Sequence, residues 1–172
     1  MLLAIDCGNT NTVFSIWDGQ RFLCTLRTAT EHQRTADQYF VWFSTLLHHY
    51  RIETRITDVI ISSTVPRVVF NLRVFADRYF GCRPLVVGKP DCLLPAMPRV
   101  DAGTQVGPDR LVNAAGAYDR HGGDLIVVDF GTARQQQHWL TQTREGRVFA
   151  TVLPLKVEKP PQSYRPTVRT VV

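Results

Sequence analysis

The sequence predicts an α/β fold in which a mixed β-sheet is flanked by helices. Three strand-like runs open the chain, and the last two are joined by Asp18-Gly19, a dipeptide typical of tight hairpin turns. Helical and strand-like segments then alternate, which indicates parallel strands with crossover helices. Two loops of similar pattern, Asp6-Cys7-Gly8-Asn9-Thr10 and Asp129-Phe130-Gly131-Thr132, each follow an apolar run. Their recurrence indicates a duplicated scaffold that holds a nucleotide between its halves.

The first third of the chain carries three strand signals and one clear helix start. The helix start is a capping box, in which the Thr35 hydroxyl and the Gln38 side chain can satisfy backbone amides that the first turn leaves free. Apolar residues recur at helical spacing after it, which predicts one buried face. That face consists of Ala36, Phe40, Phe43, Leu47 and Tyr50. The expected strands are Leu2–Asp6, Thr12–Trp17 and Phe22–Arg27.

Proline and glycine mark the elements in the middle of the chain. Pro66 suits the first turn of a second helix and Pro108 that of a third, because the first turn does not need the amide N–H that proline lacks. The third helix is expected to run to about Tyr118 and to end at His121-Gly122-Gly123. The predicted buried face of the second helix consists of Val69, Leu72, Phe75, Ala76 and Tyr79. The expected strands are Asp58–Ser62, Pro84–Val87 and Leu125–Val128.

This order of elements matches a ribonuclease H-like domain of the actin-like ATPase kind. We expect residues 1–118 to form this N-terminal domain, and residues 119–133 to supply the first strand and phosphate loop of a truncated second domain. Residues 134–172 are expected to form a basic, proline-containing tail. Four prolines argue against a long helix in that tail, and only Val148–Leu153 looks strand-like.

The positive charge of the chain is confined to this tail. The formal net charge is +5, and residues 134–172 hold seven Lys and Arg against two Asp and Glu. Residues 1–133 therefore hold 13 residues of each sign. A neutral body does not predict a basic patch on a folded surface, so we expect no nucleic-acid partner.

Apolar runs and cysteine spacing both favour a cytoplasmic protein. No run of about 18 apolar residues is present and the N-terminus lacks the pattern of a signal peptide, so we expect neither a membrane span nor secretion. The cysteines show no C-x-x-C pairing, which argues against a zinc site or a disulfide framework and for a reducing compartment. They are Cys7, Cys24, Cys82 and Cys92.

The first loop has the residue types of a phosphate-binding turn. Gly8 permits close approach of the backbone to a phosphate, and Asn9, Thr10 and Thr12 add hydrogen-bond donors. Asp6 cannot bind phosphate itself, but it can hold a divalent cation, directly or through water, against phosphate oxygens. The alternative is an ordinary hairpin turn, because Asp, Gly and Asn all suit turns.

A second candidate site lies at the predicted start of the third helix, Gly107-Pro108-Asp109-Arg110. Asp109 could act as a general base that accepts a proton from a substrate hydroxyl, and Arg110 could fix a carboxylate or a phosphate oxygen. The alternative is that Asp109 is a first-turn acid that interacts with the helix dipole, with Arg110 a surface cation.

Taken together, these segments resemble type III pantothenate kinases, members of the acetate/sugar kinase–actin-like superfamily. The resemblance covers about residues 1–133. Its motifs are Met1–Gly19 around the first loop, Val106–Ala114 around Asp109, and Asp129–Ala133 at the second loop. The run Gly107-Pro108-Asp109-Arg110 followed by Leu-Val-Asn-Ala is especially close to the family pattern.

The resemblance implies ATP-dependent phosphorylation of pantothenate to 4'-phosphopantothenate, the first step of coenzyme A biosynthesis. Asp109 matches the catalytic base of the family, and Asp129 matches a residue associated with a monovalent cation, K⁺ or NH₄⁺. Asp6 would hold Mg²⁺, and the family forms homodimers. The pantothenate-binding segment would be Gly107, Pro108, Asp109 and Arg110. The ATP-binding residues would be Asp6, Cys7, Gly8, Asn9, Thr10, Asn11, Thr12, Val13 and Thr132.

The sequence departs from the family pattern after Ala133, and we expect the tail of residues 134–172 to be unrelated to the family. The family continues its second loop as Gly-Thr-Ala-Thr-Thr, whereas Ala133 is followed here by Arg134 and three glutamines. Residues Ala133–Gln137 can be encoded by codons that read Thr-Ala-Thr-Thr in another frame, so one hypothesis is a frameshift in the gene. Two alternatives to an active kinase follow, a nucleotide-binding fragment without catalysis and a non-functional frameshift product. Sequencing of the coding DNA tests the frameshift.

Overall fold

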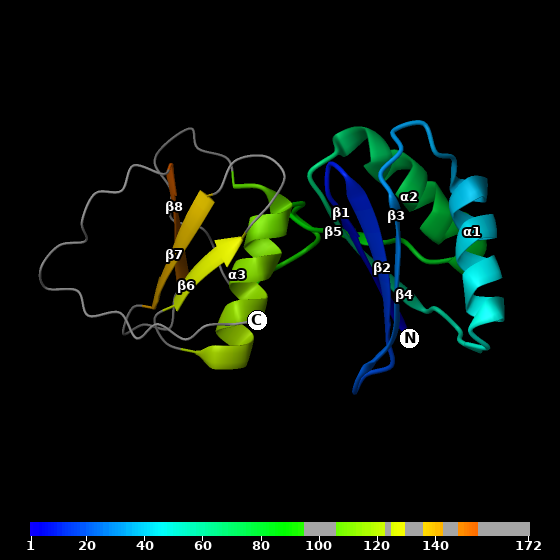
Figure 1. Ribbon diagram of the computed structural model, residues 1–172, viewed down its shortest axis with the longest axis horizontal. Coiled ribbons are helices and arrows are strands. Elements are labelled where there is room, and N and C mark those ends of the chain that lie inside the picture. Colours follow the sequence, from blue (N-terminus) through cyan, green and yellow to red (C-terminus); the bar gives the residue numbers. More distant parts are fainter. Residues whose placement is uncertain (95–105, 123–124, 130–135, 143–147, 155–172) are drawn as a thin grey trace, which may run out of the picture. The chain divides into compact units, whose positions relative to one another are not determined.

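The computed structural model describes residues 1–94, 106–122, 125–129, 136–142 and 148–154 of the 172-residue chain. The chain divides into two compact units, Met1–Leu93 and Leu94–Val172. Figure 1 labels the elements of both, and each unit is described by itself. The predicted domain boundary after residue 118 stays a prediction.

The first unit contains a five-stranded mixed sheet with the strand order β3-β2-β1-β4-β5. β1 (Leu2–Cys7) pairs antiparallel with β2 (Asn11–Trp17), which pairs antiparallel with β3 (Phe22–Ala29). On its other side β1 pairs in parallel with β4 (Asp58–Ser63), and β4 pairs in parallel with β5 (Leu85–Val86). This topology confirms the predicted mixed sheet of a ribonuclease H-like α/β fold.

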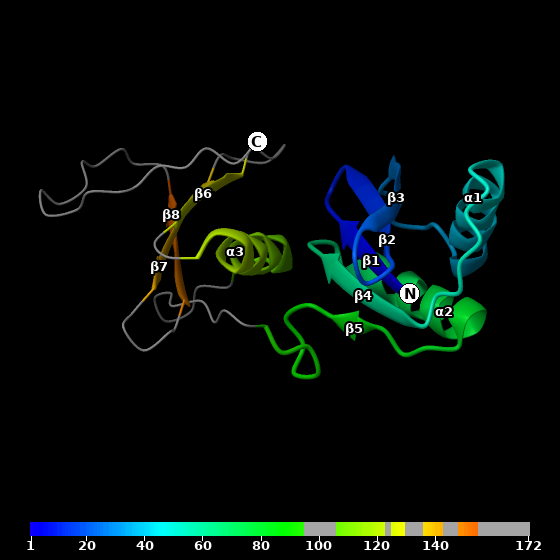
Figure 2. The ribbon, with the colours of Figure 1, turned by 90° about the horizontal axis from the view of Figure 1, so that it is seen from below.

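Both helices of this unit begin at the predicted signals. α1 (Ala36–His49) has the full capping box: the Gln38 amide donates to Thr35 Oγ1 at 3.3 Å, and the Thr35 amide donates to Gln38 Oε1 at 2.8 Å. α2 (Pro66–Phe80) has Pro66 in its first turn and ends at Gly81, whose φ of 65° is in the left-handed region that favours glycine. Figures 1 and 2 show the two helices beside the sheet.

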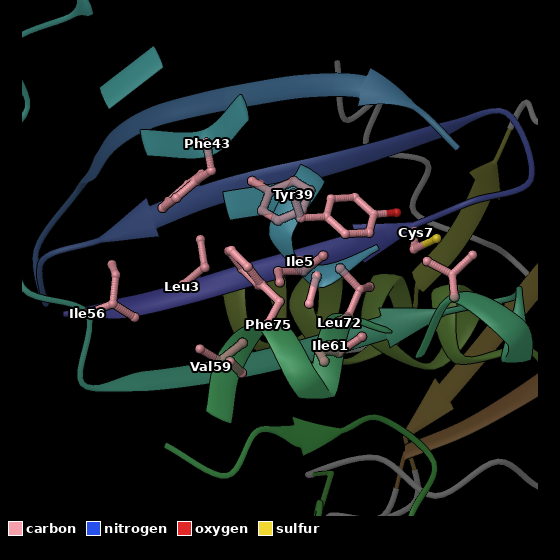
Figure 3. Close-up of a cluster of buried hydrophobic side chains, with 14 of the residues drawn as sticks. Leu3, Ile5, Cys7, Tyr39, Phe43, Ile56, Val59, Ile61, Leu72 and Phe75 are labelled. Carbon is pink, nitrogen blue, oxygen red and sulfur yellow. The ribbon is translucent and has the colours of Figure 1, made fainter. Parts of the chain in front are cut away.

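Side chains of both helices and of one sheet face form a single core. Alternate residues of β1, including Leu3 and Ile5, point into it because side chains along a strand alternate between faces. Phe14 of β2 lies at the centre, with ring centroids 5.2–5.9 Å from four aromatic rings of the helices. Figure 3 shows the labelled core side chains from both helices and from β1 and β4.

The predicted buried faces of the helices need three corrections. Tyr39, not Phe40, is the fully buried aromatic of the first turns of α1. Tyr50 was wrongly predicted to be buried: α1 ends at His49, and Tyr50 is its C-cap with 59% of its surface exposed. In α2 the deepest valine is Val68 rather than Val69. At Tyr39 and Val68 the tertiary contacts shift the most deeply buried position by one residue from the one that helical spacing predicts, whereas at Tyr50 the helix has already ended.

The second unit contains a helix and a three-stranded antiparallel sheet in the order β6-β7-β8. α3 (Pro108–His121) begins with Pro108 as predicted. β6 (Leu125–Asp129) and β8 (Val148–Pro154) confirm the two strands predicted there. β7 (Gln136–Gln142) was not predicted, because its sequence is largely polar. Among the helices in the described ranges, none is long and apolar enough to cross a membrane.

Candidate active site

The first predicted phosphate loop joins β1 to β2 at one end of the first sheet. Asp6, the penultimate residue of β1, is exposed, whereas its neighbour Cys7 is completely buried. Cys7 pairs across the sheet with Thr12, which is also completely buried. The turn itself is closed by the Gly8 amide, which donates to the Asn11 carbonyl at 3.0 Å. The strand alternation therefore turns the Asp6 carboxylate to solvent and the Cys7 side chain to the core.

Thr30, just after β3, ties the loop to the rest of the sheet. The Thr30 hydroxyl donates to the Gly8 carbonyl at 2.7 Å, and the Thr30 amide donates to the Thr10 carbonyl at 2.9 Å. The same hydroxyl lies 2.9 Å from the Thr12 hydroxyl, which is 3.3 Å from Cys7 Sγ. Thr30 thus forms one hydrogen-bonded cluster with four residues in or beside the loop, Cys7, Gly8, Thr10 and Thr12.

This cluster divides the predicted ATP-binding residues into those with buried side chains and those with side chains exposed to a ligand. Cys7 and Thr12 are occupied beneath the loop, so their side chains support its shape, whereas Asp6, Asn9, Thr10 and Asn11 are exposed. Sequence reasoning missed Thr30. No local signal marks it, because its importance depends on the pairing of β2 with β3.

Tyr39 lies under the same end of the sheet. Its side chain is completely buried, and in Figure 3 its hydroxyl points towards Cys7. The hydroxyl has no hydrogen-bond partner among the described residues. Burial, followed by the nearby Cys7, raises the pKa of Tyr39 from 10.0 to about 12. The Arg34 guanidinium lies 5.0 Å from the centre of the Tyr39 ring and partly opposes this shift.

Replacing Tyr39 with phenylalanine removes a buried hydroxyl that forms no hydrogen bond with the described residues. We expect Tyr39→Phe to raise the free energy of unfolding at neutral pH by about 1 kcal/mol, because a buried unsatisfied group costs about 1–3 kcal/mol. The contribution of the tyrosine proton to stability is complete below pH 10 and is lost as the pH rises towards about 12. Because Tyr39→Phe lacks this proton, its free energy of unfolding should fall less between pH 10 and about pH 12 than that of the wild-type chain. Urea unfolding at a series of pH values checks both effects, and a less stable variant at neutral pH would contradict the assignment.

The second candidate site is the N-terminus of α3, where Asp109 lies in the first turn. Gly107 is the N-cap and offers no side chain to cap the helix. Asp109 Oδ1 is buried and accepts no hydrogen bond from any described residue. A carboxylate that served only the helix dipole would be solvated or would accept a backbone amide, so this geometry favours the general-base interpretation.

Gly107 leaves the space that the Asp109 carboxylate occupies. A Cβ atom built on Gly107 would lie 2.5 Å from Asp109 Oδ1. The φ of Gly107 is −62°, a value that any residue can adopt, so the backbone conformation does not itself require glycine. We therefore expect Gly107→Ala to rotate the carboxylate away while changing the melting temperature little. Activity should fall by about a hundredfold, since displacement of a catalytic group by about 1 Å costs that much. Gly116→Ala is the control, because nothing lies within 4 Å of a Cβ there. Equal activity of the two variants would contradict the steric role.

Three predicted site residues remain, Arg110, Asp129 and Thr132. Arg110, half-buried in the first turn of α3, forms no ion pair with any described residue. Asp129 ends β6 and pairs in register with Gln136 of β7. Thr132 lies outside the described residues. The loop belongs to the first unit, whereas Asp109 and Asp129 belong to the second, so their meeting in one site stays a prediction.

At each of the predicted cation sites, Asp6 and Asp129, the protein would supply a single carboxylate. Within the described ranges, no three His, Cys, Asp or Glu side chains cluster in a way that could hold a metal ion. An exposed aspartate beside a phosphate loop fits Mg²⁺ well, because Mg²⁺ keeps several waters and binds through one or two carboxylates plus substrate phosphates. Asp6 meets that description.

Comparison with known sequences decides the family. The sequence model of type III pantothenate kinases matches residues 2–140, a range that contains the first loop, the Asp109 segment and the second loop. This chain belongs to the type III pantothenate kinase family. The match runs seven residues past Ala133, into the segment that we expected to be an unrelated tail.

Relatives within this family are highly similar over part of their length. The type III pantothenate kinase of Ruegeria pomeroyi is 86% identical over 133 residues, which cover 77% of this chain and 51% of the relative. That of Jannaschia sp. is 77% identical over 133 residues, with the same coverage. The chain thus spans about half the length of these curated relatives. A solved structure of a putative N-acetylglucosamine kinase from Porphyromonas gingivalis aligns with a TM-score of 0.48 and 18% identity, over 91% of this chain and 49% of that one, which is too distant to bear on function.

Proposed function

We propose that this protein catalyses the ATP-dependent phosphorylation of pantothenate to 4'-phosphopantothenate. The observation that carries the proposal is the match of residues 2–140 to the type III pantothenate kinase family, because that range includes all three motif segments. Asp109 Oδ1, which is buried and accepts no hydrogen bond from the described residues, supports it independently, since a general base needs an acceptor atom that is free to take a proton.

In the proposed reaction Asp109 accepts the proton of the pantothenate hydroxyl. The hydroxyl oxygen forms a bond to the γ-phosphorus of ATP while the bond from that phosphorus to the bridging oxygen breaks, and ADP leaves. Arg110 pairs with the carboxylate of pantothenate and thereby orients the hydroxyl towards the phosphate. Transfer of this kind needs mainly positioning and charge stabilisation from the protein.

The first loop would receive the phosphates of ATP. Its backbone amides and the exposed side chains of Asn9 and Thr10 act as donors, and the Asp6 carboxylate would hold Mg²⁺. When bound, Mg²⁺ supplies neutralisation of charge on the phosphate oxygens. Asp129 would serve a K⁺ or NH₄⁺ ion, and Thr132 a second contact to ATP. A homodimer and a cytoplasmic location complete the proposal; the four cysteines, which are all free thiols, support the latter.

Formation of ADP in the presence and absence of pantothenate tests this function. We expect pantothenate to stimulate ADP formation and K⁺ or NH₄⁺ to increase the rate. A chain whose coding sequence restores the family reading frame after Ala133 is the comparator. ATP binding without turnover would instead support a nucleotide-binding fragment, and the absence of both binding and turnover would contradict the proposal for this chain.

A further inference from the structure

The carbonyl oxygens of the first phosphate loop are held by donors from neighbouring strands. The Cys7 carbonyl accepts from the Thr64 amide at 3.1 Å, at the end of β4. The Gly8 carbonyl accepts from the Thr30 hydroxyl at 2.7 Å, and the Thr10 carbonyl accepts from the Thr30 amide at 2.9 Å. Thr30 therefore supplies two of these three donors, from a position just after β3 that is not part of the loop.

These contacts fix the direction of the loop amides. The chain has no cis peptide bond among its described residues, and in a trans peptide the C=O and N–H groups point in opposite directions. When Thr30 draws the Gly8 and Thr10 carbonyls towards β3, the N–H groups of Asn9 and Asn11 turn away from it. A loop that binds phosphate has to present N–H groups rather than carbonyl oxygens to the anion.

The Thr30 hydroxyl is itself held in position. Its Oγ1 atom donates to the Gly8 carbonyl at 2.7 Å and lies 2.9 Å from the Thr12 hydroxyl. Thr12 is completely buried, and its hydroxyl donates to Cys7 Sγ at 3.3 Å. Thr30 Oγ1 is thus held between the buried Thr12 hydroxyl and the Gly8 carbonyl of the loop.

We propose that Thr30 is a positioning residue for ATP, which orients the Gly8–Asn9 and Thr10–Asn11 peptide units so that their amides face the phosphates. The proposal rests on the proposed function, in that ATP is taken as the ligand of this loop. Thr30 touches no reacting atom; it acts through the backbone of the loop.

Two substitutions of Thr30 distinguish the effect of its hydroxyl group from the effect of its side-chain shape. Thr30→Val keeps the branched side chain and the backbone amide but removes the donor to Gly8, and Thr30→Ser keeps the donor. We expect Thr30→Val to weaken ATP binding by about tenfold, the effect of losing one hydrogen bond, and Thr30→Ser to restore it. Thr25→Val is the matched control, because Thr25 lies on β3, five residues before Thr30, and its hydroxyl pairs with that of Ser15 at 3.1 Å in an exposed position.

Isothermal titration calorimetry with ATP and Mg²⁺ measures the dissociation constants, and NMR of the nucleotide-free chain measures the amide shift of Asn9. Thr30→Val should move the Asn9 amide signal and Thr25→Val should not. If wild-type chain does not bind ATP, the proposed function fails, while the Asn9 signal still decides whether Thr30 orients the loop. Wild-type affinity and an unmoved Asn9 signal in Thr30→Val, or failure of Thr30→Ser to restore binding, would overturn the role of the hydroxyl.

Discussion

Replacing Asp109 with asparagine should reduce the rate of phosphotransfer to pantothenate by about a hundredfold to ten-thousandfold, the range typical for loss of a general base. Asparagine has nearly the same shape and can still lie over Gly107, but its amide cannot take a proton at neutral pH. Because the carboxylate oxygen of Asp109 is buried without a partner, the change removes no hydrogen bond from the described residues. The initial rate of product formation at saturating ATP and pantothenate measures the effect.

A second acid of the same helix provides the control for this prediction. Asp119 lies in the last turns of α3 and is exposed, so Asp119→Asn changes the net charge equally at a distance from the proposed base. We expect that variant to keep the wild-type rate and melting temperature. If Asp109→Asn and Asp119→Asn had equal rates, Asp109 would not be the base.

Truncation of Phe75 to alanine should cost the first unit about 3–5 kcal/mol of unfolding free energy, the usual cost of removing a buried phenylalanine. Phe75 of α2 is completely buried, and its ring meets Phe14 and Phe43 edge-to-face at centroid distances of 5.9 Å. It therefore joins the sheet to both helices. A typical domain has a total stability of about 5–15 kcal/mol, so the variant should be partly unfolded at physiological temperature.

The same substitution at Phe70 separates core packing from helix propensity. Phe70 lies on α2 with 70% of its surface exposed, so Phe70→Ala should change the unfolding free energy by less than about 0.5 kcal/mol. Urea unfolding followed by the fluorescence of Trp42, which packs against Phe14, compares the two variants. A similar loss in both would show that the aromatic core does not carry the stability.

Element positions could be predicted wherever a local signal is strong. Thr35 and Gln38 satisfy each other's amides whatever the rest of the fold does, and Pro66 and Pro108 are suited to first turns for reasons internal to each helix. The buried stripe of α1 was less predictable, because Tyr39 is selected by its contact with Phe14 of another element. Strand β7 was missed because its pairing with β6 and β8, and not its polar sequence, makes it a strand.

The candidate site shows the same division between local and tertiary information. Asp6, Gly8 and Asp109 follow from short motifs whose residue types suit phosphate and proton chemistry. Thr30 and Tyr39 belong to no motif, and they reach the loop only because β3 and α1 pack beside it. The role of Gly107 could not be predicted from the sequence either, because it depends on the direction in which the carboxylate of Asp109 points.

Transfer of labelled phosphate tests the proposed function most directly. Purified chain is incubated with ATP labelled at the γ-phosphate, pantothenate, Mg²⁺ and K⁺, and the products are separated by chromatography. We predict label in 4'-phosphopantothenate, at a rate that Asp109→Asn reduces by at least about a hundredfold and Asp119→Asn preserves. Label that stays in ATP or appears only as inorganic phosphate would contradict the assignment of this chain as a pantothenate kinase.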